Sequence, residues 1–177
     1  MLTEPLPSTL DVRKAAARGV SISGALKPLD LQRFRALLAG DAGQIQASFA
    51  FSRDEEGRSV VRAVIRAEVA VICQRCLRPM PLAFGSDSTL GIVWNDDQAR
   101  HLPKHLDPLI VTEEACDLWQ VVEEELMLAL PPYSYHAEND CNEDLVGYTG
   151  NVPEAGADAA APSPFEVLAQ FKPGNKN

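Results

Sequence analysis

Two cysteines separated by two residues are the sharpest candidate for chemistry in this sequence. Cys73 and Cys76 can direct both thiolates to one metal ion or close a redox disulfide. A thioredoxin-like redox site opens a helix, whereas two prolines follow Cys76 closely and disfavour a helix start. His136 and Cys141 form a second pair, and Cys73, Cys76, His136 and Cys141 could hold zinc as a Cys3His set. The alternative is a core thiol at Cys73, with the other three residues in turns or on the surface.

A group of arginines forms the second candidate site. Three of them recur at intervals of four on the polar side of a predicted strand, about 13 Å apart at the rise of a strand. The other two extend the positive charge into the cysteine turn, and the five are Arg58, Arg62, Arg66, Arg75 and Arg78. Such a row could contact the phosphates of a nucleic acid, which fixes position without reading the base sequence. It could equally be a solvated face whose charge is balanced by Glu68 and the acidic turn 54–56.

The remaining candidates do not form an active site. Glu123, Glu124 and Glu125 point in different directions around a predicted helix, so they are not a general acid–base pair. A solvated face explains them, although an acidic surface could meet a basic protein. Cys116 is expected to be packed on the same helix. Because the sequence has no glycine-rich phosphate loop and no nucleophile motif, we expect a protein that is not an enzyme.

The charge of the chain is divided unevenly along its 177 residues. The whole sequence has 16 basic and 25 acidic residues and a net charge of -9, which opposes the binding of phosphate groups by bulk charge. Residues 1–112 carry a net charge of +2, whereas residues 113–177 carry -11. The excess acid therefore belongs to the C-terminal third, and the arginines belong to a nearly neutral remainder.

Alternating apolar and polar residues predict three long strands, over residues 45–51, 58–73 and 80–94. One buried and one solvated face is typical of antiparallel sheets. Other patterns predict helices over 10–18, 31–38 and 114–130, a loop over 96–108 and a short strand over 109–111. The expected fold class is α+β: an antiparallel sheet or partly closed barrel with a meander core, a few flanking helices and a flexible acidic C-terminal segment.

Composition also predicts how the chain is divided and where it acts. We expect a single α+β domain over 1–136, a loosely ordered acidic linker over 137–163, and a short docking helix and tail over 164–177. The first residues lack the pattern of a secretory signal, and no apolar run approaches the roughly 18 residues of a membrane span. The sequence thus predicts a cytoplasmic protein without membrane contact.

Three motifs in order resemble those of one bacterial family. The first is Cys73-x-Arg75-Cys76-Leu77 after an apolar strand. The second runs from Val122 to Pro131 and is followed by His136 and Cys141; the third runs from Pro164 to Lys172. Together these motifs resemble the YceD family, the large ribosomal RNA subunit accumulation proteins, over nearly the whole chain.

This resemblance implies a non-enzymatic role in the synthesis, processing or stability of 23S rRNA, in assembly of the large ribosomal subunit. The implied partner is 23S rRNA or its precursor, and the five arginines are the candidates that would contact it. An alternative is a chaperone-like protein that binds a basic large-subunit ribosomal protein through the acidic C-terminal third. Zinc is the one cofactor that the residues suggest.

Overall fold

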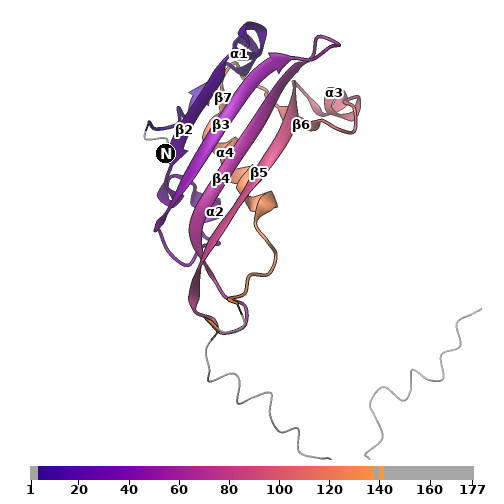
Figure 1. Cartoon of the computed structure of the whole chain (residues 1–177). Coiled ribbons are helices and arrows are strands. Elements are labelled where there is room, and N and C mark those ends of the chain that lie inside the picture. Colours follow the sequence, from indigo (N-terminus) through magenta and orange to yellow (C-terminus); the bar gives the residue numbers. More distant parts are fainter. Residues whose placement is uncertain (1–3, 138–139, 142–177) are drawn as a thin grey trace, which may run out of the picture. The chain divides into compact units, whose positions relative to one another are not determined.

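The computed structural model describes residues 4–137, 140 and 141, and a five-stranded sheet lies at its centre (Figure 1). The strand order is β2-β3-β4-β5-β6, and neighbours are antiparallel except that β6 runs parallel to β5. A separate two-stranded sheet pairs β1 with β7. The strands are β1 (Thr9–Leu10), β2 (Ser21–Leu26), β3 (Gly43–Arg53), β4 (Ser59–Ile72), β5 (Pro79–Val93), β6 (Asp107–Ile110) and β7 (Cys116–Asp117).

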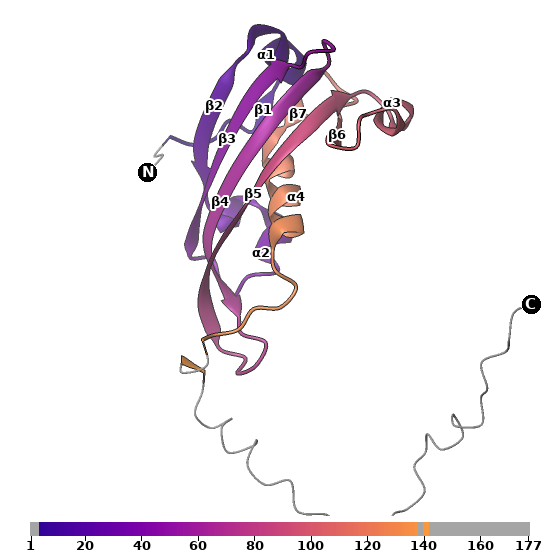
Figure 2. The same ribbon diagram turned by 45° about the vertical axis from the view of Figure 1, so that its right-hand side comes forward.

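The helices that pack on the sheet cover one of its two faces. They are α1 (Val12–Arg18), a 3₁₀ turn (Pro28–Asp30), α2 (Gln32–Arg35) and α4 (Leu118–Ala129), whereas α3 (Asp96–Arg100) lies beside β6 at the edge of the sheet (Figure 1). Figure 2 shows α1, α2 and α4 on the same side of the sheet. Alternate residues of β4, such as Ala63 and Ile65, are fully buried on that side, and Val122 and Leu126 of α4 are buried with them. The opposite face, which carries Arg62 and Arg66, has no covering helix among the described residues.

A buried carboxylate joins α2 to α4. Glu123 of α4 accepts hydrogen bonds from the backbone N–H groups of Arg33 (2.6 Å) and Phe34 (3.2 Å), and from Arg33 Nε at 2.8 Å. It thereby serves the unpaired N–H groups at the start of α2, where Leu31 supplies no side-chain cap. The prediction that the three glutamates form a solvated face is therefore wrong for Glu123, which is 8% exposed.

The predicted α+β fold with an antiparallel meander is confirmed, whereas a barrel is not formed because β2 and β6 are separate ends of the strand order. The helix expected from residue 114 begins at Leu118, since the Asp117 side chain caps it by accepting from the N–H groups of Trp119 and Gln120. The loop predicted over 96–108 contains the short helix α3, capped in the same way by Asn95.

The predicted acidic linker and docking helix fall almost entirely outside the described residues. Within the described part of the chain, none of the helices has the length and apolar character needed to cross a membrane.

Candidate metal centre and arginine surface

The turn that joins β4 to β5 carries the two predicted cysteine ligands. Cys73 N donates to Arg78 O, and Leu77 N donates to Cys73 O, both at 2.9 Å, so the turn closes on itself. Leu77 adopts a left-handed backbone conformation (φ 57°), a role that glycine usually fills in tight turns. The motif lacks that glycine, and the leucine side chain is left 72% exposed.

The segment after α4 brings a histidine to this turn from sixty residues further along the chain. The helix ends before Pro131-Pro132, and Figure 1 shows the following segment running to the end of the sheet where the β4–β5 turn lies. Gln74 N donates to the carbonyl of the buried Ser134 at 2.9 Å, which fixes the segment beside the turn. As a result, His136 Nδ1 lies 3.3 Å from Cys76 Sγ.

The four predicted ligands lie together. One ligand atom from each of Cys73, Cys76, His136 and Cys141 lies within 4.8 Å of all the others. Sulfur ligands of a tetrahedral zinc ion, each about 2.3 Å from the metal, stand about 3.8 Å apart, so only a small contraction would be needed. Three thiols and one imidazole are also ligand types that zinc prefers. The cluster could therefore bind a metal ion.

The electrostatics of the cluster favour the thiolate form of Cys73, whereas they favour the protonated form of His136, whose proton a metal ion would have to displace. Burial of the Cys73 thiol opposes its ionisation, but N–H groups of Cys76, His136 and Arg75, together with the His136 ring, lower its pKa from 9.0 to about 5. The hydrogen bond with Cys73 raises the pKa of His136 against the opposing effect of burial. The site thus holds a thiolate at neutral pH, which is the species that coordinates metal.

Cys116 lies apart from the cluster. It belongs to β7, not to the helix in which it was expected, and it is buried as predicted. Burial raises the pKa of its thiol to about 11. The thiol is therefore neutral at neutral pH and acts as a packed core group.

The five predicted arginines do not form one uniform row. Arg58 is engaged by Asp54 (2.6 Å) and Glu56 (2.8 Å), and Arg62 makes a bidentate pair with Asp87 at 2.9 and 2.8 Å. These carboxylates neutralise the two guanidinium groups locally. The alternative of a balanced, solvated face is therefore the better description of Arg58 and Arg62.

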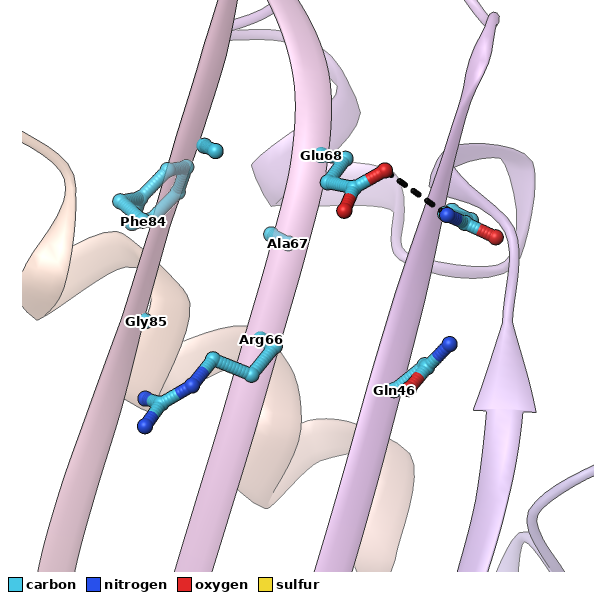
Figure 3. Close-up of a pocket in the computed structure, with 8 residues that line it drawn as sticks. Gln46, Arg66, Ala67, Glu68, Phe84 and Gly85 are labelled. Atoms are coloured by element: carbon cyan, nitrogen blue, oxygen red, sulfur yellow. Dashed lines mark hydrogen bonds between the residues drawn. The ribbon is translucent and has the colours of Figure 1, made fainter. Parts of the chain in front are cut away.

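Arg66 differs from its neighbours because it has no ion pair within the described residues. Its Nη1 lies 3.5 Å from the Ile65 carbonyl, and the side chain extends over Gly85 of β5 (Figure 3). A Cβ atom at Gly85 would clash with the Ile65 carbonyl oxygen and would also lie 2.8 Å from that Nη1, so glycine gives room first to the neighbouring backbone and then to the guanidinium. Glu68 lies further along β4 and accepts a 2.8 Å hydrogen bond from the Gln44 side chain. Arg66 and Glu68 both line a shallow pocket of about 440 Å³.

Arg75 and Arg78 lie in the exposed cysteine turn with a set of apolar and aromatic side chains. The Arg75 guanidinium stacks over the Tyr135 ring at 5.5 Å from its centroid. Tyr133 and Tyr135 are 69% and 49% exposed. We call this surface, formed by Arg75, Leu77, Arg78, Tyr133 and Tyr135, the tip. The tyrosines were not among the predicted site residues, although a pair of aromatics just before a predicted ligand was a usable signal.

Comparisons with known proteins place the chain in a family. A family model described as "Large ribosomal RNA subunit accumulation protein YceD" matches residues 61–172, which include the cysteine turn and the segment that carries His136 and Cys141. A protein of Haemophilus influenzae named large ribosomal RNA subunit accumulation protein YceD is 31% identical over 169 residues, covering 94% of this chain and 96% of that protein. No solved structure matches the chain. The chain therefore belongs to the YceD family of large ribosomal RNA subunit accumulation proteins.

Proposed function

We propose that this protein supports the accumulation of 23S rRNA as a non-enzymatic factor, by binding the rRNA or its precursor through the tip during assembly of the large subunit in the cytoplasm. The family description and the relative's name support the involvement with large-subunit RNA. The observation that carries the binding mode is the contact of Arg75 with the exposed Tyr135 ring, where the turn that also carries Arg78 meets the segment that also carries the exposed Tyr133.

The tip has the chemistry that single-stranded RNA needs. Exposed aromatic rings and guanidinium planes stack on unpaired bases, and arginine also pairs with phosphate. Residues 73–78 and 131–137 contain no aspartate or glutamate, in contrast to the carboxylates beside Arg58 and Arg62. Since the whole chain carries -9, binding must depend on such a local surface. Arg66 is the strand arginine most suited to extend the contact.

We further propose that the Cys73, Cys76, His136 and Cys141 cluster holds zinc. Four protein ligands leave no open coordination position, which is typical of structural zinc sites and not of catalytic ones. When bound, the ion would fix the turn and the segment after α4 in the arrangement that presents the tip.

RNA binding by the tip can be tested with two double variants of equal charge. Arg75→Glu/Arg78→Glu should weaken binding to fragments of immature 23S rRNA by more than about tenfold. It should also make the slope of log affinity against log salt shallower, by the equivalent of about two phosphate contacts. Arg18→Glu/Arg100→Glu makes the same change in net charge on exposed residues of α1 and α3, at the other end of the sheet (Figure 1), and should have a much smaller effect.

Equal losses in the two double variants would show that only net charge matters. Unchanged affinity in the tip variant would refute the tip as the binding surface.

A further inference from the structure

A groove runs between the edge of strand β5 and helix α4. Its volume is about 550 Å³. It is lined by Ser86 and Ser88 of β5, by Asp107 of β6, and by Glu124, Glu125 and Leu128 of α4. Leu128 is a large apolar side chain on α4, and 83% of it is exposed to solvent. Figure 2 shows α4 beside the β5 end of the sheet.

The edge of β5 that borders this groove is open. Among the described strands, β6 pairs only with Leu90–Val93 of β5, so the edge between Pro79 and Thr89 has no strand partner on the side away from β4. Proteins commonly protect such edges with proline or lysine. Here Pro79 and Pro81 protect only the end near the cysteine turn, and neither residue type occurs from Leu82 to Thr89. An extended segment could therefore add beside Gly85–Thr89, in line with β6.

The charge of the groove specifies what that segment would be. A second groove of about 500 Å³ continues along α4 and shares Leu109, Val121 and Glu124 with the first. The lining of the two grooves contains no lysine, arginine or histidine, and its five carboxylates belong to Asp107, Glu113, Asp117, Glu124 and Glu125.

One of these carboxylates, that of Glu125, is held in place beside β5. Glu125 Oε2 accepts hydrogen bonds from the hydroxyls of Ser86 (2.6 Å) and Ser88 (2.8 Å), which hold the side chain against the strand edge. Glu124 is exposed and makes a longer contact, 3.3 Å, with Arg33 outside the groove lining. A carboxylate held in place beside an open strand edge suits a cationic side chain on an added strand, because little conformational entropy is lost on binding.

We infer that this groove binds an extended, basic segment of a protein partner by adding it to the edge of β5. Backbone hydrogen bonds to the strand edge would hold the segment, its lysine or arginine side chains would meet carboxylates of the groove such as those of Glu124 and Glu125, and its apolar side chains would cover Leu128. RNA is repelled from this surface by the same carboxylates. The inference concerns a surface separate from the tip and does not depend on RNA binding there.

A direct test uses the full chain and a labelled twelve-residue peptide that alternates lysine and valine. We expect saturable binding that weakens as salt rises. A peptide that alternates glutamate and valine should not bind. The lysine–valine peptide with an N-methyl group on every backbone amide keeps its charge but cannot donate to a strand from either of its edges, and should bind at least about tenfold more weakly.

Two neighbouring variants locate the site. Leu128→Lys places a positive charge in the groove and should weaken peptide binding about tenfold, whereas Met127→Lys, next to it and outside the groove lining, should not. Arg75→Glu/Arg78→Glu should bind the peptide normally, which separates this result from the test of RNA binding.

Equal binding of the N-methylated peptide, or equal losses in the two lysine variants, would overturn the inference. So would a chain that self-associates, binds no basic peptide and becomes monomeric in Leu128→Lys, because a second copy would then occupy the edge.

Discussion

At the scale of single residues, Glu123 shows how one buried carboxylate determines local structure. It accepts from two backbone N–H groups at the start of α2 and from the Arg33 side chain, while Glu124, its neighbour, is half exposed. Removing a buried acceptor leaves its donors unpaired, which costs far more than removing an exposed ion pair.

We predict that Glu123→Ala lowers the free energy of unfolding by about 3 kcal/mol. Glu124→Ala, the matched control, should change it by less than about 1 kcal/mol, because its ion pair is exposed. Denaturant unfolding of both variants measures the difference. Similar losses in the two would contradict the role given to Glu123.

The contribution of Glu123 to the free energy of unfolding should also depend on pH. Burial raises the pKa of this carboxyl, but the Arg33 side chain and the two N–H groups outweigh it and hold the pKa below 4.5. Because the folded pKa is the lower one, the stabilisation is complete above about pH 4.5 and is lost as the pH falls through the folded value. The difference between wild type and Glu123→Ala should therefore shrink in acid.

At the scale of elements, the sequence predicts the strands well and their neighbours poorly. Alternation over β4 follows directly from which face is buried, and this pattern is confirmed along the strand. Whether Arg62 is paired depends on register: it lies opposite Thr89, which places Asp87 diagonally next to it. No local pattern reports this cross-strand relation, and so the predicted arginine row was too uniform.

The ligand cluster illustrates the same limit. Each pair of ligands is recognisable from its own spacing, but their meeting depends on the path after α4. That path is set by a proline pair and by the hydrogen bond from Gln74 to Ser134, which joins segments sixty residues apart. Long-range placement of this kind comes from tertiary packing and is not encoded in a periodic pattern.

We predict that purified wild type contains about one zinc ion per chain and that Cys76→Ser loses most of it. Amide hydrogen exchange should then accelerate in residues 73–78 and 131–137, since the ion would hold these two segments together, while β3 and β4 remain protected. Elemental analysis and exchange mass spectrometry measure the two effects.

Cys116→Ala removes a thiol outside the cluster and should keep the metal. A folded, metal-free wild type, or equal metal loss in the two cysteine variants, would refute the zinc site.

At the scale of the whole molecule, the sign of charge changes from one surface to the next. The tip carries two arginines without adjacent carboxylates in its two segments, whereas the groove beside α4 is lined by carboxylates alone among its charged groups. A chain with a net charge of -9 can in this way offer one surface to RNA and another to a basic protein. The other acidic residues of the chain contribute to the electrostatic potential at both surfaces, and this contribution should repel RNA.

This repulsion can be measured through residues 142–177, which carry five acidic and two basic side chains. Replacing the five with their amides keeps the length of the chain and removes five negative charges. We predict that RNA affinity then rises several-fold at about 0.05 M salt, where the Debye length exceeds 10 Å, and that the gain disappears near 1 M, where it is about 3 Å. Lys172→Gln/Lys176→Gln should act in the opposite direction. A gain independent of salt would show instead that these residues compete for the RNA surface by direct contact.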